Sequence, residues 1–242
     1  MDSGQPTRSA ADGADWPSRW VSMTLIVCAL TNAAFLIWWL VGVRLSFSSS
    51  FVSEFSADGE PGALTYRLFD LVTGVMLLAA LDMLWNVFPK SRLVRVSQFA
   101  LILFALLTII DSALPLDCAP TADAICRQRE ELGFVTFAHQ AHGITGILES
   151  AAINIALLLL PWVLWRKHGW EWFSRWSVVL GAIYMVGNGM IIVQYMFGIE
   201  GLGITQRAQI LTFSAFLVLL DVTQRRLFQE GSRARWVAVV RG

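Results

Sequence analysis

The chain has 242 residues, of which 56% are hydrophobic and only 15% are charged, and its formal net charge is zero. Soluble globular domains carry about 25% charged residues, so this composition excludes an ordinary soluble domain. A neutral chain also has no bulk electrostatic attraction to polyanions, and we expect no nucleic-acid partner.

The hydrophobic residues are gathered into runs long enough to cross a bilayer, which takes about 20 apolar residues in a helix. The alternation typical of membrane β-barrels is missing. We therefore predict an all-α, polytopic integral membrane protein with a six-helix transmembrane domain over residues 20–228. The expected spans are 20–43, 66–88, 93–114, 137–165, 176–197 and 204–228.

The two ends of the chain are polar. Residues 1–19 are rich in Ser, Ala, Asp and Gly, and we expect a disordered cytoplasmic tail there. Residues 229–242 are basic and contain one Trp, which predicts a cytoplasmic tail that lies along the membrane surface.

Most of the 18 lysines and arginines lie in the two tails and in the turns after the second and fourth spans. In membrane proteins, the cytoplasmic loops contain more Lys and Arg than the loops on the other side of the membrane. This distribution predicts a multi-pass plasma-membrane protein with both termini in the cytoplasm. The connections after the first, third and fifth spans would then face outward.

Residues 111–149 form the longest interruption between apolar runs and hold two of the three cysteines and two of the three histidines. Cys118 and Cys126 would face an oxidising exterior, which permits a disulfide. We predict that bridge, the alternative being two free thiols in an outer loop. Cys28, inside the first span, is expected to be a small packing residue.

Four possible metal ligands are expected at the outer membrane face: Asp70, Asp111, His139 and His142. The two histidines are three residues apart and share one face of a helix. Imidazoles and carboxylates together suit one divalent metal, with zinc the first choice. The alternative is a hydrogen-bonded polar cluster without metal.

Two glutamates, Glu54 and Glu149, are the candidate catalytic acid and base. Glu149 continues the helical stripe of His142, seven residues later. Substrate contacts are predicted from Arg207, Ser53 and Arg67, because an arginine fork fits a phosphate or carboxylate headgroup. A structural salt bridge between Arg67 and Asp70 is the alternative for that pair.

The stretch SEFSADGEPG at residues 53–62, followed by RLFD and Gly74, resembles the DUF998 family (domain of unknown function 998) of prokaryotic membrane proteins. Leu114-Pro115 and a histidine that opens the next span are also similar to that family. The resemblance implies a six-helix fold and brings no established activity. A weaker similarity is to intramembrane zinc hydrolases of the alkaline ceramidase type, although the chain lacks their terminal HxxxH pattern.

Two hypotheses follow. The first is a metal-dependent hydrolase or transferase that acts on a lipid or lipid-linked substrate. The second is a non-catalytic accessory or lipid-binding membrane protein whose disulfide-closed outer cap docks a partner. Membrane lipid is the expected partner in both, and a protein partner or homo-oligomer stays open.

Overall fold

The computed structural model describes residues 16–241, with side chains over 18–230, and this part of the chain is all-α without a β-strand. Its elements are α2 (Trp16–Asn32), η1 (Ala34–Ile37), α3 (Trp38–Val41), η2 (Ser53–Ser56), α4 (Ala63–Leu84), α5 (Arg92–Ser112), α6 (Ala124–Glu131), α7 (Phe137–Leu164), α8 (Glu171–Phe197) and α9 (Leu202–Arg241). The expected disorder of the N-terminal tail falls largely on residues outside this part.

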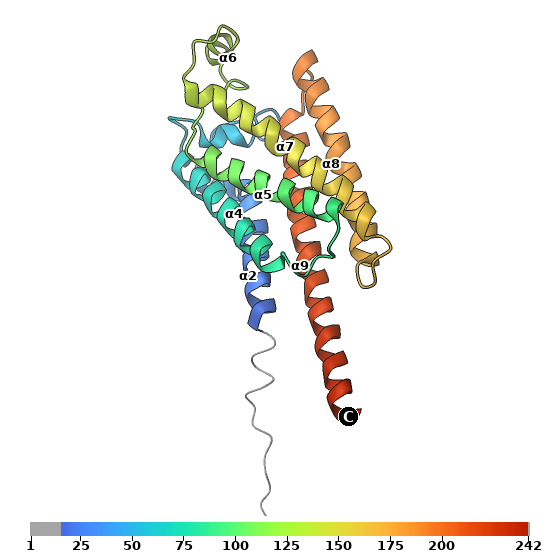
Figure 1. Cartoon of the computed structure of the whole chain (residues 1–242). Coiled ribbons are helices and arrows are strands. Elements are labelled where there is room, and N and C mark those ends of the chain that lie inside the picture. Colours follow the sequence, from blue (N-terminus) through green and yellow to red (C-terminus); the bar gives the residue numbers. More distant parts are fainter. Residues whose placement is uncertain (1–15, 242) are drawn as a thin grey trace, which may run out of the picture.

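Six long helices form a closed ring. Each of α2, α4, α5, α7, α8 and α9 packs against the next one in the chain, and α9 returns to pack against α2. The ring encloses an apolar core that includes Leu77, Leu81, Leu101, Leu157 and Phe216, all at most 2% exposed. Burial of these side chains stabilises the fold, because each makes many van der Waals contacts with its neighbours. α2 begins at the end of the bundle where α9 finishes (Figure 1).

Several helices are long and apolar enough to cross a membrane. Within the described residues, α5, α7, α8 and the 202–230 part of α9 qualify, and α2 with the bent η1–α3 segment would make a fifth span. α4 has 22 residues but carries Arg67, Asp70 and Asp82. The chain therefore has the helices of a multi-pass membrane protein, while the count of six spans stays a prediction.

The first predicted span, residues 20–43, is wrong as one continuous helix. α2 starts earlier, at Trp16, and the chain bends by 54° after Asn32. The side-chain amide of Asn32 donates to the carbonyl of Ile210, at 3.1 Å, and to the hydroxyl of Ser214, at 2.9 Å. This attachment to α9 fixes the position of the break, which the hydrophobic pattern did not reveal.

The last predicted boundary also differs. α9 does not stop at residue 228 but continues as a helix to Arg241, through the segment expected to be a tail on the membrane surface. The other boundaries shift by a few residues. α4 ends at Leu84 because the helical donor to the next carbonyl, that of Trp85, would be Pro89, which has no N–H, and this carbonyl accepts a hydrogen bond of 2.9 Å from Arg95.

The loops opposite the chain ends form a compact structure that we call the cap, made of residues 42–62 and 113–136. It contains η2 and α6, and α6 lies above the start of α7 (Figure 1). The two loops are joined directly, since the amide of Asp58 donates to the carbonyl of Leu116 at 2.8 Å. The predicted site residues lie in the cap and in the helix ends below it.

Candidate functional site

Glu54 is the central polar residue of the cap. It sits in η2 with 1% of its surface exposed. One carboxylate oxygen accepts from the amide of Thr121 at 2.7 Å, and the other accepts from the Thr121 hydroxyl and from the Phe51 amide at 3.0 Å. Burial raises the pKa of this carboxyl although these bonds act in the opposite direction. Both oxygens are thus engaged in joining the two cap loops.

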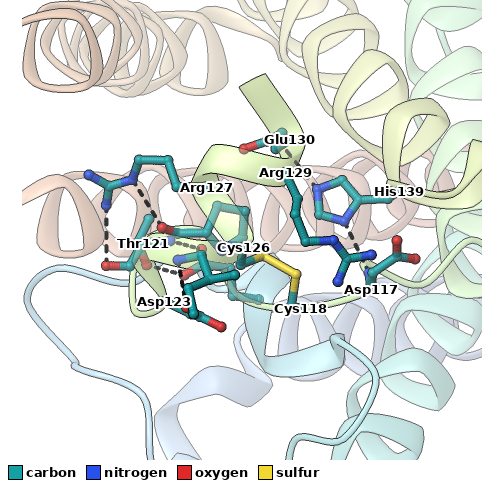
Figure 2. The surroundings of a disulfide bond; sticks show 12 residues. Asp117, Cys118, Thr121, Asp123, Cys126, Arg127, Arg129, Glu130 and His139 are labelled. Atoms are coloured by element: carbon teal, nitrogen blue, oxygen red, sulfur yellow. Dashed lines mark hydrogen bonds and ion pairs between the residues drawn. A yellow bond between two sulfur atoms is a disulfide. The ribbon is translucent and has the colours of Figure 1, made fainter. Parts of the chain in front are cut away.

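The predicted disulfide is confirmed, because Cys118 and Cys126 are bonded to each other. Figure 2 shows this bridge between the turn that carries Thr121 and the start of α6. Asp123 caps α6, accepting a hydrogen bond of 2.8 Å from the Ile125 amide. The bridge closes a short loop, so it holds Thr121 within reach of Glu54.

His139, at the start of α7, holds the adjacent cap loop and is not part of a metal-binding arrangement of the described residues. Its Nδ1 accepts a hydrogen bond of 3.0 Å from the Asp117 amide, so a neutral ring carries its proton on Nε2. That Nε2 lies 3.4 Å from Glu130 without forming a hydrogen bond. Figure 2 shows the ring between these two partners. In this state neither nitrogen offers a lone pair to a metal.

Asp117 completes this side of the cap. Its carboxylate accepts from both the amide and the hydroxyl of Thr136, the N-cap residue of α7. Partial burial alone would raise the pKa of Asp117, but the hydrogen bonds from Thr136 lower it below its usual range. The carboxylate therefore fixes the start of α7 against the loop.

His142 has different partners from His139. Its Nδ1 lies 2.8 Å from the Leu114 carbonyl and 3.8 Å from Asp111. Because a carbonyl only accepts, Nδ1 carries the proton, and in a neutral ring Nε2 then has a free lone pair. The Asp111 carboxylate also accepts a short hydrogen bond from Thr145.

Asp70 and Asp111 lie within electrostatic range of Glu149 on α7. One buried oxygen of Glu149 makes no hydrogen bond to the described residues. The structure thus brings His142 and these three acids to one part of the bundle, whereas His139 bonds to the cap loop through the Asp117 amide. In the part of the chain that the structure covers, no three His, Cys, Asp or Glu side chains are arranged to hold a metal ion.

Arg67 and Ser53 lie at the other side of the cap. Arg67 does not pair with Asp70. Its Nη2 lies 2.5 Å from Asp58, and its Nε donates to the Ser56 carbonyl at 2.9 Å. The Ser53 carbonyl accepts from the hydroxyl of Ser56 at 2.7 Å, which closes the turn of η2. Both residues stabilise the cap loop that follows α3.

Arg207 lies on α9 and is 2% exposed. Its guanidinium is surrounded by the rings of Phe47, Phe55 and Phe35, with centroids at 4.4, 5.0 and 5.9 Å. Nη1 donates to the Ser50 carbonyl at 2.9 Å, whereas Nε and Nη2 make no hydrogen bond to the described residues. A buried cation with two unused donors is unusual, because such groups are normally paired.

Gly203 permits the approach of Arg207 to the cap loop. A Cβ at this position would lie 2.6 Å from both Nη1 of Arg207 and the Ser50 carbonyl. The Gly203 amide donates to the Ser48 carbonyl at 2.9 Å, so α9 holds the loop by its backbone as well. A residue with a side chain would push the loop away from the arginine.

Sequence reasoning missed the residues that complete these contacts. Thr121, Asp117 and Thr136 gave no signal, because loop threonines and aspartates are common and their partners are distant in the chain. The aromatic residues around Arg207 were equally hidden, although Phe55 directly follows Glu54 in the SEFS stretch. Only the folded loop brings them to α9.

No curated protein and no solved structure matches this chain. The family described as "Protein of unknown function (DUF998)" matches residues 25–223, a range that runs from α2 into α9 and includes the whole cap. The chain therefore belongs to the DUF998 family.

Proposed function

We propose that the protein is a non-catalytic, lipid-binding protein of the plasma membrane, with both termini cytoplasmic and the cap outside. The observation that carries the proposal is the state of Glu54. Its two oxygens accept three hydrogen bonds and it is 1% exposed, so it lacks the access to substrate that a general base needs, and most of its lone pairs are already engaged. The cap acts as a rigid clamp on the helix ends.

The disulfide supports the outward orientation of the cap, since such bonds persist in oxidising compartments. Exposed apolar side chains at the cap edge support contact with the outer leaflet. Phe134 and Phe137 are 69% and 81% exposed and stand where α7 begins, and Ile125 on α6 is 70% exposed. Aromatic side chains at this level are typical of a membrane–water interface.

A groove between α8 and α9 gives the proposal a binding surface. It holds about 460 Å³ and is lined mainly by apolar side chains, including Ile183, Val186, Met190, Ile204 and Ala208. This volume lies within the range of roughly 300–1,000 Å³ typical of ligand sites. We propose that an acyl chain of a membrane lipid occupies it.

Lipid retention is the test. Protein purified in a mild detergent and examined by native mass spectrometry should retain about one phospholipid per chain. Ala208→Trp would fill the groove and should reduce retention at least threefold, whereas Ala215→Trp, on a different part of α9, should not. A delipidated protein that takes up no phospholipid when it is added back would contradict the proposal.

A second candidate is the metal-dependent hydrolase or transferase, favoured by one observation. In a neutral ring His142 has a free Nε2 lone pair, its Nδ1 lies 3.8 Å from Asp111, and Asp111 and Asp70 lie within electrostatic range of Glu149. A metal there would activate water. One zinc per purified chain, lost in His142→Ala and kept in His139→Ala, is the expected result for this candidate; a zinc-free wild-type protein would exclude it.

A further inference from the structure

We propose that Arg207 forms a binding site for a phosphate oxyanion, and that its ligand is the headgroup phosphate of a membrane lipid. The inference rests on the proposed lipid-binding function and names the headgroup chemistry that this function would recognise.

The first argument is the identity of the unused donors. In a guanidinium, Nε–H and one Nη2–H point in the same direction and form a two-pronged edge that matches two oxygens of a phosphate or carboxylate. These are the two Arg207 atoms that make no hydrogen bond to the described residues. The third nitrogen, Nη1, is held by the Ser50 carbonyl at 2.9 Å. The arginine is therefore oriented with one complete fork unoccupied.

The second argument is the lack of a compensating charge. Glu54 is the acid that acts on Arg207 electrostatically, but the two form no ion pair, and the Glu54 oxygens are occupied by Thr121 and Phe51. A buried cation without an ion-pair partner is costly, because the hydration that it loses is not compensated. The three phenyl rings offset part of this cost. An anion on the free edge would offset the remainder.

The third argument is that further unpaired hydroxyls lie nearby. Tyr66 and Ser50 are 5% and 1% exposed, and neither Tyr66 Oη nor Ser50 Oγ makes a hydrogen bond in the described structure. Tyr66 lies within electrostatic range of Arg207, and its ring contacts Phe55 with centroids 5.3 Å apart. With the arginine fork, these hydroxyls supply donors to more than two oxygens. A carboxylate has only two oxygens, whereas a phosphate has more, so this number of donors favours a phosphate.

The position in the helix fits a headgroup. Arg207 is five residues after the start of α9, which corresponds to roughly 7.5 Å at the rise of an α-helix. Ile204, three residues before Arg207, and Ala208, the residue after it, line the groove proposed for an acyl chain. The Phe47 ring, whose centroid lies 4.4 Å from the guanidinium carbon, is itself 40% exposed, and we expect a headgroup to displace it on entry.

The test uses the full-length protein in detergent and measures its thermal unfolding midpoint. The probes are a short-chain phosphatidylglycerol, the diacylglycerol with the same acyl chains but no phosphate, and inorganic phosphate at constant ionic strength. Phosphatidylglycerol should raise the midpoint by clearly more than the diacylglycerol, which can occupy only the acyl-chain groove. A shift produced equally by inorganic phosphate would support the oxyanion site and identify free phosphate as its source.

The variants separate ligand binding from folding. Arg207→Lys keeps the charge but has no fork, and its apparent affinity for phosphatidylglycerol should fall at least tenfold. Tyr66→Phe should weaken binding severalfold, and Arg127→Lys, the same change on α6 of the cap, should have no effect. A midpoint without ligand that stays close to wild type shows that Arg207→Lys is folded.

Failure of the oxyanion site and failure of the lipid-binding function would give different results. If Arg207→Lys binds phosphatidylglycerol as tightly as the wild type, the oxyanion site is wrong while the lipid-binding function stands. If no lipid, with or without phosphate, shifts the wild-type midpoint and none is retained on purification, both proposals are wrong.

Discussion

The cap end of the molecule contains two buried charges that differ in their surroundings. Glu54 is 1% exposed and accepts hydrogen bonds at both oxygens from Thr121 and Phe51. Arg207 is 2% exposed, donates one hydrogen bond to Ser50 and faces three phenyl rings. A fully partnered charge stabilises the structure that surrounds it. A charge with a free two-pronged edge would gain further stabilisation from a ligand, and this difference distinguishes the structural role of Glu54 from the binding role that we propose for Arg207.

The largest expected effect is that of Glu54→Ala. It leaves the buried amides of Thr121 and Phe51 without acceptors, and each unsatisfied buried donor costs about 1–3 kcal/mol. The free energy of unfolding in detergent should fall by about 3 kcal/mol. Glu60→Ala, on the same loop, is the matched control and should change it by less than about 0.5 kcal/mol. If the two variants lowered the free energy of unfolding equally, the structural role assigned to Glu54 would be wrong.

Loss of the disulfide should come next. The double variant Cys118→Ser, Cys126→Ser opens a loop of sequence separation 8. The entropy gained by the unfolded chain predicts a loss of about 2.5 kcal/mol, measured by chemical unfolding with and without reductant. Thr121 would no longer be held against Glu54, so a subsequent Glu54→Ala change should cost less than it does in the wild type. Simple additivity of the two changes would show that the bridge does not support the Glu54 contact.

Arg207→Met tests the other charge. Replacing a buried unpaired cation by an apolar side chain of similar length removes its desolvation cost, and such replacements are often neutral or stabilising. Without lipid, the free energy of unfolding should change by less than about 1 kcal/mol, in contrast to Glu54→Ala. With phosphatidylglycerol present, the wild type should gain stability and the variant should not. A loss as large as that of Glu54→Ala, in the absence of lipid, would mean that Arg207 is structural.

The smallest effect concerns pH and two carboxyls of the cap. The folded pKa of Asp117 lies below 3.8, so its stabilising contribution is present at neutral pH and is lost as the pH falls through that lower value. The folded pKa of Glu54 lies above 4.5, so its pH-dependent contribution is lost as the pH rises through that higher value.

Unfolding midpoints recorded from about pH 7 down to about pH 3 should therefore show two opposite slopes. Asp117→Asn should flatten the acidic slope and Glu54→Gln the one nearer neutral pH. If both variants flattened the same slope, one of the two pKa directions would be wrong.

The sequence by itself determined the fold class, the family and the pairing of the two loop cysteines. Long apolar runs can only be helices in a membrane, because every backbone amide there needs an internal partner. The pair Cys118 and Cys126 had no competing loop cysteine, since Cys28 lies in an apolar run. These features depend on local pattern and composition, which the chain carries in any conformation.

The break after Asn32 and the partners of the polar residues were decided by tertiary structure. Asn32 ends α2 by bonding to residues far along α9, and Glu54 meets Thr121 from the other cap loop. The histidines share one helix face, yet His139 accepts from Asp117 and His142 lies against Leu114. Spacing along a helix fixes only the direction of a side chain. The donor or acceptor that a side chain meets depends on how distant segments of the chain pack. Packing of this kind gives Glu54 partners at both oxygens and leaves one edge of Arg207 without a partner in the described structure.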